Sequence, residues 1–326
     1  MRQRLTSDQY ATAILAGDRL TLSRAITLVE SRRADDQALA RQVLAQVLPA
    51  TGRAIRVGIT GVPGVGKSTF IEAFGNHLID LGHRLAVLAI DPSSQRSGGS
   101  LLGDKTRMET LSMNPAAYIR PSPAGDSLGG VAHRTRETML LCEAAGFDVI
   151  LIETVGVGQS ETVVHGLVDF FLLLMLAGAG DELQGMKRGI MELADALAIT
   201  KADGDNTGAA NRARVEYQNA LHLFPPTETG WLPPVLTCSA QTGAGIGPIW
   251  TMLREHQAQM TAGGHWQARR QTQQLLWFRS LLRQQLDARF FGQPGIQARL
   301  SELETQLKAG TLLPGAAVDA LLNAVV

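Results

Sequence analysis

The sequence predicts an α/β protein of the doubly wound class, with a mostly parallel sheet at its centre. Short apolar, β-branched runs alternate with helical patterns from Ala54 to about Trp250, which is typical of parallel strands joined by crossover helices. Within this stretch, residues 61–68 read Gly-Val-Pro-Gly-Val-Gly-Lys-Ser, between a strand-like run and a helical pattern. This is the pattern of a phosphate loop (P-loop), so the sequence predicts a P-loop NTPase.

The apolar runs are predicted to be the strands of this sheet. Most of them are almost wholly apolar, as expected for strands that are covered on both faces. The predicted strands are Ile55–Thr60, Leu85–Ile90, Ala117–Ile119, Val149–Glu153, Phe170–Met175, Ala196–Thr200 and Pro234–Cys238.

Helical patterns flank the sheet region at both ends of the chain. Residues 6–48 read as helices, with Ser7 and Asp18 as candidate N-caps. Residues 267–291 and 297–307 also read as helices, separated by Gly-Gln-Pro-Gly. These changes of pattern predict a helical N-terminal extension at 1–53, a P-loop domain at 54–254 and a helical C-terminal arm at 255–326.

The C-terminal arm carries an apolar stripe that needs a covering surface. The stripe either packs back on the core of the same chain or forms a dimerisation surface, and the pattern alone favours neither strongly. We carry forward the dimerisation arm as the prediction. The stripe consists of Leu275, Leu276, Leu281, Leu282 and Leu286.

Composition excludes several classes of protein. Lys and Arg together number 30, as do Asp and Glu, so no net basic charge points to nucleic acid or to an anionic membrane. The longest apolar run, residues 170–179, is about half the length that a membrane span needs. Cys142 and Cys238 lack metal-ligand spacing and are expected to be buried free thiols. The chain is predicted to be cytoplasmic, with no nucleic-acid or membrane partner.

The P-loop supplies the predicted phosphate-binding residues. Its glycines let backbone N–H groups curl around an anion, while Lys67 can reach the β- and γ-phosphates of a nucleotide. The hydroxyl of Ser68 can ligate Mg²⁺. The predicted residues are Gly61, Val62, Pro63, Gly64, Val65, Gly66, Lys67, Ser68 and Thr69.

A second motif predicts that the base of the nucleotide is guanine. Thr200-Lys201-Ala202-Asp203 follows a predicted strand and fits the pattern [NT]-K-x-D. The carboxylate of Asp203 can accept from both N1–H and the 2-amino group of guanine, a pair that adenine lacks. Thr200 keeps a hydroxyl where asparagine is commoner, so its tethering role is open. Ser239, Ala240 and Gln241 follow the next strand, where backbone N–H groups can meet the guanine oxygen.

Three carboxylates complete the predicted Mg²⁺ site with Ser68. Asp91 follows a predicted strand, Asp104 lies beyond a Ser-Gly-Gly-Ser stretch, and Glu153 ends another strand. On local evidence Asp91 could instead be an N-cap, and Asp104 could lie in a solvated loop. Glu153 is followed by Thr-Val-Gly-Val-Gly-Gln-Ser-Glu, a pattern typical of a switch loop that responds to the γ-phosphate. Glu153 and Lys67 are therefore predicted catalytic residues.

A third glycine-rich loop, residues 178–189, follows the strand that ends near Met175. It contains Asp181, Gln184 and Lys187. Taken alone, this loop is better interpreted as an ordinary helix start with an acidic first turn.

Several segments occur together in one order and carry a family resemblance. They are Gly-Val-Pro-Gly-Val-Gly-Lys-Ser-Thr-Phe, Asp-Pro-Ser-Ser, Gly-Gly-Val-Ala with Thr-Arg-Glu-Thr-Met, Glu-Thr-Val-Gly-Val-Gly-Gln-Ser-Glu, and Gly-Ala-Gly-Asp-Glu-Leu-Gln-Gly-Met-Lys. The set resembles the MeaB/ArgK family, metallochaperone-like GTPases that are associated with methylmalonyl-CoA mutase. The resemblance covers most of the chain and is strongest from Arg56 to Asn206.

The resemblance implies a homodimeric GTPase that serves as a chaperone of the adenosylcobalamin-dependent mutase. Such a protein gates cofactor loading and protects or reactivates the mutase. By the same resemblance, Asp181, Gln184 and Lys187 belong to a third switch that couples the nucleotide state to the mutase. Ala177 stands where a proline often precedes that loop.

The predicted reaction is Mg²⁺-dependent hydrolysis of GTP to GDP and phosphate, driven by positioning and electrostatic stabilisation. No residue stands out as a water-activating base. One alternative is a small-molecule kinase or transport ATPase, in line with the older ArgK label. Another is a metal-insertion GTPase, although the chain has neither a His-rich nor a Cys-x-x-Cys tract.

Overall fold

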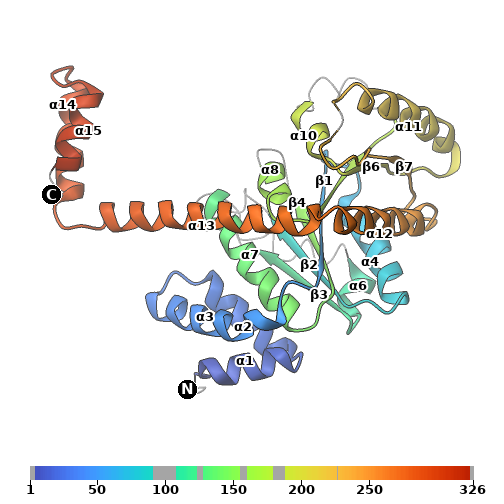
Figure 1. Ribbon diagram of the computed structural model, residues 1–326, viewed down its shortest axis with the longest axis horizontal. Coiled ribbons are helices and arrows are strands. Elements are labelled where there is room, and N and C mark those ends of the chain that lie inside the picture. Colours follow the sequence, from blue (N-terminus) through green and yellow to red (C-terminus); the bar gives the residue numbers. More distant parts are fainter. Residues whose placement is uncertain are drawn as a thin grey trace. The chain divides into compact units, whose positions relative to one another are not determined.

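The structure is a computed structural model that describes residues 4–90, 108–122, 128–154, 160–178, 188–225 and 227–323 (Figure 1). The chain divides into two compact units, Met1–Arg270 and Gln271–Val326. Within the described ranges, no helix has the length and apolar character needed to cross a membrane.

The first unit is built on a seven-stranded parallel sheet, which confirms the predicted doubly wound class. The strand order is β3-β2-β4-β1-β5-β6-β7. Because β1 lies between β4 and β5, the loop after β1 leaves the sheet near its centre, where ligands of such folds bind. The strands are β1 (Ile55–Gly61), β2 (Leu85–Ile90), β3 (Ala117–Ser122), β4 (Val149–Thr154), β5 (Phe170–Met175), β6 (Ala196–Ile199) and β7 (Val235–Thr237).

Strand β5 illustrates why these runs are wholly apolar. Its six residues are all buried, and alternate side chains belong to different cores. Phe170, Leu172 and Leu174 lie in one hydrophobic cluster, and the intervening side chains lie in clusters on the other face. Since side chains alternate across a strand, a run without polar residues is what a sheet covered on both faces requires.

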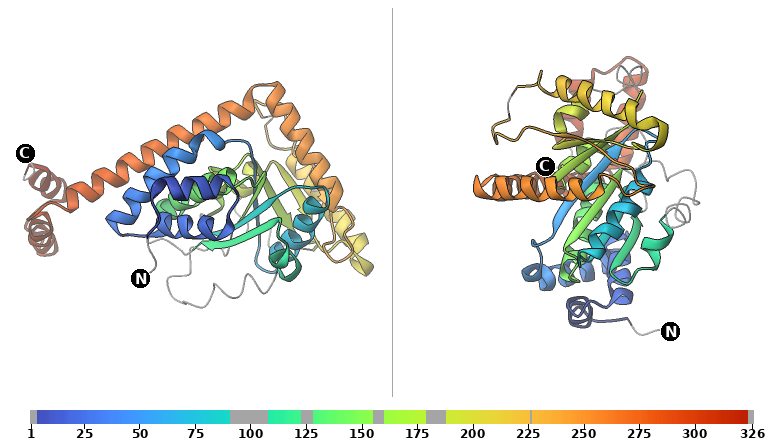
Figure 2. Two further views of the ribbon diagram at one scale, coloured as in Figure 1. Left: turned by 90° about the horizontal axis from the view of Figure 1, so that it is seen from below. Right: turned by 90° about the vertical axis from the view of Figure 1, so that its right-hand side faces the viewer.

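Helices cover both faces of the sheet (Figure 2). One face packs against α4 (Lys67–Asp80), α6 (Glu109–Met113) and α12 (Ile246–Ala262). The other packs against α7 (Leu128–Ala144), α8 (Ser160–His165), α10 (Arg188–Leu193) and α11 (Thr207–Leu221).

The N-terminal helices form a layer against α7 in the first unit (Figure 1). They are α1 (Ser7–Leu15), α2 (Arg19–Glu30) and α3 (Ala34–Val47). Asp18 is the N-cap of α2, as predicted, and accepts from Thr21 N at 2.6 Å. The N-cap of α1 is Thr6 rather than the predicted Ser7, because Thr6 and Gln9 close a capping box.

Helix α6 is capped by another helix instead of by its own N-cap residue. Its N-cap is Met108, whose side chain makes no capping hydrogen bond. Glu72 of α4 takes this role: its Oε1 accepts from Thr110 N at 2.8 Å, from Leu111 N at 3.2 Å and from the Thr110 hydroxyl. A Cβ on Gly75 would lie 2.9 Å from a methyl carbon of Leu111, so the missing side chain lets α6 approach α4 closely.

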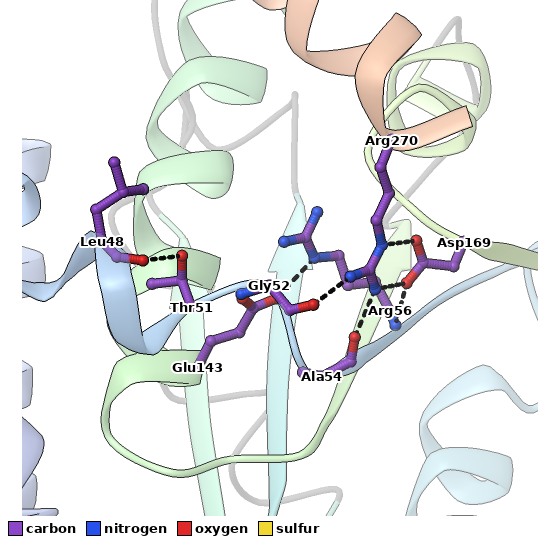
Figure 3. A network of polar contacts seen from close by, with 8 residues as sticks. All are labelled: Leu48, Thr51, Gly52, Ala54, Arg56, Glu143, Asp169 and Arg270. Atoms are coloured by element: carbon purple, nitrogen blue, oxygen red, sulfur yellow. Dashed lines mark hydrogen bonds and ion pairs between the residues drawn. The ribbon is translucent and has the colours of Figure 1, made fainter. Parts of the chain in front are cut away.

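A buried ion network joins the amino ends of β1 and β5 to helix α13 (His265–Phe291) (Figure 3). Arg270 donates to both carboxylate oxygens of Asp169, at 2.7 and 2.6 Å, and to the carbonyls of Gly52 and Ala54. Asp169 also accepts from the backbone N–H of Arg56 at 2.9 Å.

On the other side of this network, the Arg56 guanidinium donates to Glu143 of α7 at 2.7 Å. Glu143 also accepts from the backbone N–H of Gly52. The two guanidinium groups, of Arg270 and Arg56, are thus paired with two carboxylates, of Asp169 and Glu143. This pairing offsets the desolvation cost of burying the charges. The network holds the linker that precedes β1 between α7 and α13.

The second unit contains the rest of α13, α14 (Ile296–Lys308) and α15 (Pro314–Leu322). The two helices predicted from the C-terminal pattern correspond to α13 and α14. Of the predicted stripe, Leu275, Leu276, Leu282 and Leu286 are exposed, whereas Leu281 is half-buried. The division of the chain at residues 53 and 254 stays a prediction.

Candidate functional site

The phosphate loop lies between the end of β1 at Gly61 and the start of α4 at Lys67. Gly66 is the N-cap of α4 and has a φ of 93°, a conformation that favours glycine. At Gly61 an added Cβ would lie 2.5 Å from the carbonyl oxygen of Leu174, so the approach of β5 also requires glycine. A Cβ on Gly64 would meet nothing within 4 Å, so the loop is open at this point. These features fit the cradle that a phosphate needs.

Lys67 lies over this loop. Its Nζ donates to the carbonyl of Gly61 at 2.8 Å and to that of Val62 at 3.3 Å. Burial lowers the pKa of Lys67, although the negative charges of Glu153 and Glu161 oppose that shift. A partly desolvated ammonium group held at the loop is suited to binding an anion.

Two of the four predicted Mg²⁺ residues lie together. The Ser68 hydroxyl donates to Oε1 of Glu153 at 3.2 Å, and Glu153 is only 3% exposed at the end of β4. Hydroxyl and carboxylate oxygens are ligands that Mg²⁺ accepts, so this pair fits part of a Mg²⁺ site. Asp91 and Asp104 lie outside the described residues, and no cluster of three or more potential metal ligands occurs among those that are described.

The guanine motif is hydrogen-bonded to the phosphate loop. The Thr200 hydroxyl donates to Val65 O at 2.7 Å and also lies 3.2 Å from Met175 O. Lys201 has a φ of 56°, the one positive value among the described non-glycine residues, and its Nζ donates to Gly64 O at 3.0 Å. The hydroxyl that replaces the commoner amide therefore does connect the end of β6 to the loop.

Asp203 is oriented by the loop after β7. The Ser239 hydroxyl donates to Asp203 Oδ2, and the backbone N–H of Ala202 donates to Cys238 O at 3.0 Å. Ser239 itself is fully buried and accepts from Thr242 N at 3.2 Å. One carboxylate oxygen of Asp203 is thus fixed by a neutral donor, which sets the direction of the side chain.

These two motifs line one cavity of about 260 Å³. The phosphate-loop side contributes Val65, Gly66, Thr69 and Phe70. The other side contributes Thr200, Lys201, Asp203, Cys238, Ala240 and Gln241. A single cavity that reaches from the phosphate loop to the carboxylate of Asp203 has the layout that a nucleotide site needs.

Sequence reasoning did not name Phe70 and Cys238 as lining residues. Phe70 follows directly after the predicted loop and Cys238 precedes the predicted Ser239, so adjacency was the available signal. Asp181, Gln184 and Lys187 lie outside the described residues. The roles assigned to individual site residues stay predictions, although the structure brings many of them to one place.

The chain matches known proteins over nearly its whole length. The model of the family "Methylmalonyl Co-A mutase-associated GTPase MeaB" matches residues 22–295. GTPase ArgK of Escherichia coli is 48% identical over 298 residues, covering 91% of this chain and 90% of that protein. The mitochondrial methylmalonic aciduria type A homolog of Mus musculus is 48% identical over 327 residues, covering 97% of this chain and 79% of that protein.

A crystal structure described as an LAO/AO transport system kinase is similar in fold and sequence. It has a TM-score of 0.79 and 39% sequence identity, and the match covers 100% of this chain and 99% of that chain. Together with the P-loop fold, these matches confirm the predicted GTPase class and a guanine nucleotide as its ligand. The chain belongs to the MeaB family of methylmalonyl-CoA mutase-associated GTPases.

Proposed function

We propose that this GTPase is a chaperone of an adenosylcobalamin-dependent methylmalonyl-CoA mutase, gating cofactor loading and protecting or reactivating the mutase. The observation that carries the proposal is the connection between the two halves of the site. Thr200 and Lys201 donate to Val65 O and Gly64 O, so the base-binding and phosphate-binding segments are in direct contact. Such a contact suits a protein whose conformation must report which nucleotide is bound.

In this proposal Asp203 selects the base. Its carboxylate accepts from N1–H and the 2-amino group of guanine, while the stem of Lys201 lies along the ring. The Ser239 hydroxyl keeps the carboxylate in place. Adenine offers no matching pair of donors, which disfavours the transport-ATPase alternative that the older label suggests. Competition for the site by GDP against ADP and ATP separates the two alternatives.

Lys67 and the backbone N–H groups of the loop stabilise the charge on the transferring phosphoryl group. Ser68 and Glu153, together with Asp91 and Asp104 from the sequence, would hold Mg²⁺. When bound, Mg²⁺ neutralises part of the phosphate charge. Asp181, Gln184 and Lys187 are proposed as the switch residues that link this chemistry to the mutase.

The partner is tested by co-purification. The full-length protein is mixed with an adenosylcobalamin-dependent methylmalonyl-CoA mutase in the presence of GDP or a non-hydrolysable GTP analogue. The proposal expects a complex whose stability differs between the two nucleotides, and faster steady-state GTP hydrolysis when mutase is added. Absence of a complex in both nucleotide states, with an unchanged rate of hydrolysis, would contradict it.

The proposal includes a homodimer formed through the C-terminal arm. The exposed leucines of α13 support this, because an exposed apolar stripe on a long helix favours association. Light scattering on the full-length chain measures the mass directly. Leu275→Glu together with Leu282→Glu is expected to give a monomer that still binds GDP, and an unchanged dimer would contradict the assignment of this stripe.

The proposed setting is the cytoplasm, without a nucleic-acid or membrane partner. The equal numbers of acidic and basic residues support this, because no net positive charge attracts polyanions. Cell fractionation is expected to place the protein in the cytoplasmic fraction and not with the membranes. Nuclease treatment of the purified protein is expected to release no bound nucleic acid.

A further inference from the structure

The ladder between β1 and β4 ends where the phosphate loop begins. The last paired residues of these two strands are Ile59 and Glu153. Beyond this pair, β1 remains paired with β5 as far as Gly61, which lies opposite Leu174. Strand β4 remains paired with β2 as far as Thr154. The two central strands therefore lose their shared register at the point where their chains enter the candidate site.

One side-chain contact bridges the strands beyond this point. The hydroxyl of Thr154 donates to the hydroxyl of Thr60 over 2.9 Å. Both residues are almost wholly buried, with 2% of Thr60 and 1% of Thr154 exposed. Because side chains alternate along a strand, Thr60 points to the same face as Gly58, which is the face packed against Val164 of α8.

Each threonine is the sequence neighbour of a residue of the predicted phosphate and Mg²⁺ site. Thr60 precedes Gly61, whose carbonyl accepts from Lys67 Nζ at 2.8 Å. Thr154 follows Glu153, whose carboxylate accepts from the Ser68 hydroxyl at 3.2 Å. The hydrogen bond between Thr60 and Thr154 therefore joins the two strands just beyond the last residue pair of their ladder. It is one residue away from Gly61 on β1 and one residue away from Glu153 on β4.

The stability of the fold does not by itself explain why threonine, and not an apolar residue, occupies both positions. Replacing both members of a buried hydrogen bond with apolar groups of the same shape is nearly neutral or even stabilising. Valine has the shape of threonine, and apolar β-branched residues occupy three other positions in each of β1 and β4. Two hydroxyls at this point therefore indicate a requirement of the site rather than of the core.

We propose that Thr60 and Thr154 are positioning residues for GTP hydrolysis. Their hydrogen bond sets the spacing between Gly61, where the phosphate loop starts, and Glu153, on the predicted Mg²⁺ side. The inference rests on the proposed roles of Lys67, Ser68 and Glu153. It does not involve the walls of the base cavity, so the affinity for GDP is expected to depend on it far less than the rate of hydrolysis.

The test compares Thr60→Val, Thr154→Val and the double variant in the full-length protein. Each single variant leaves one buried hydroxyl without its partner and is expected to lower the Tm, whereas the double variant is expected to recover much of the Tm. In all three, kcat is expected to fall about tenfold or more, with the Kd for GDP changed by less than about twofold. Thr154→Ser keeps the hydroxyl and is expected to retain kcat.

Thr135→Val is the matched control. Thr135 is fully buried in α7, where its hydroxyl donates to Val131 O at 2.9 Å. Its replacement removes a buried hydroxyl of the same kind away from the phosphate loop, and it is expected to leave kcat unchanged.

A kcat that recovers together with the Tm in the double variant would show a purely structural role and overturn the inference. So would a kcat that is unchanged in all valine variants. Glu153→Gln, measured alongside, tests the proposed function separately: an undiminished kcat there contradicts the role of Glu153 itself. If Glu153→Gln loses activity while the valine variants keep it, only the inference about the threonine pair fails.

Discussion

The hydroxyl of Thr200 and the backbone carbonyl of Val65 are joined by a buried hydrogen bond of 2.7 Å. This bond connects the strand end that carries the guanine motif to the middle of the phosphate loop. A threonine at this position makes the connection with one donor, where an asparagine side chain would have two. Lys201 holds the neighbouring carbonyl of Gly64, so it is the position of Val65 that should depend on this single hydroxyl group.

Thr200→Val is expected to weaken GDP binding. The variant keeps the shape of the side chain but removes the hydroxyl donor to the buried carbonyl of Val65, whereas Met175 O still accepts from the backbone N–H of residue 200. The expected loss is about 1–3 kcal/mol or about 5- to 150-fold in Kd. Isothermal titration with GDP measures the change. Thr200→Ser, which keeps the hydroxyl, should bind nearly as tightly as wild type. Equal affinities for the valine and serine variants would show that the hydrogen bond does not hold the loop.

Asp203→Asn is expected to lose the preference for guanine. The substitution replaces one acceptor oxygen of the carboxylate with an NH2 donor, which cannot pair with a donor of guanine but can donate to the C2 carbonyl of xanthine. GDP should bind at least about tenfold more weakly, since hydrogen bonds to charged groups contribute about 1.5–3 kcal/mol each, and XDP should bind more tightly than to wild type. Asp205→Asn, an exposed neighbour in the same turn, is the control. Unchanged selectivity in Asp203→Asn would remove this residue from the base site.

Arg270→Ala is expected to destabilise the first unit severely. It leaves Asp169 buried with one fewer cation and removes the donors to Gly52 O and Ala54 O. Removing one partner of a buried ion pair typically costs about 3–5 kcal/mol. Urea denaturation followed by circular dichroism gives the change, with exposed Arg279→Ala in the same helix as control. A loss below about 1 kcal/mol, the range of surface pairs, would mean that the network is not structurally important.

His133 and Glu137, one turn apart on α7, should affect the pH dependence of stability in opposite directions. Burial lowers the pKa of His133 to about 4 and raises the pKa of Glu137 to about 7. The unfolded chain binds a proton at His133 more readily than the folded protein does. This residue therefore lowers the stability of the fold as pH falls from 6.5 to about 4. Glu137 holds its proton more firmly when folded, so it stabilises the fold as pH falls from about 7 to 4.5.

Single substitutions should separate these two effects. Relative to wild type, His133→Gln should gain stability on acidification below pH 6.5, and Glu137→Gln should lose stability on acidification below about pH 7. Each difference should reach about 1–3 kcal/mol. Thermal denaturation at intervals between pH 4.5 and 7.5 is the measurement. Parallel curves for wild type and both variants would contradict the burial of these groups.

Most strands of the sheet could be predicted because they are apolar runs. The end of the edge strand β3 could not be predicted in this way. Strand β5 matches its predicted bounds, since the whole run is buried on both faces. Strand β3 was predicted to end at Ile119 and instead reaches Ser122 through Arg120 and Pro121. It lies at the edge of the sheet, where proline is tolerated, and the charge of Arg120 is paired with Glu30 of α2.

The position of the candidate site could be predicted from two short motifs, the phosphate loop and the segment with Asp203, which line one cavity. Features that depend on distant neighbours could not. Whether Thr200 reaches the loop depends on the placement of Val65, more than a hundred positions earlier in the chain. The positive φ of Lys201 and the contact between Thr60 and Thr154 likewise arise only when separate strand ends meet.

The capping of α6 by Glu72 also constrains the order in which the chain can fold. A helix of five residues is too short to persist alone, and its first N–H groups find their acceptor 38 residues earlier, on α4. Helix α4 must therefore be formed before α6 can be stable. The contact between α6 and α4 is therefore expected to form late in folding, after the phosphate-loop helix has provided its surface.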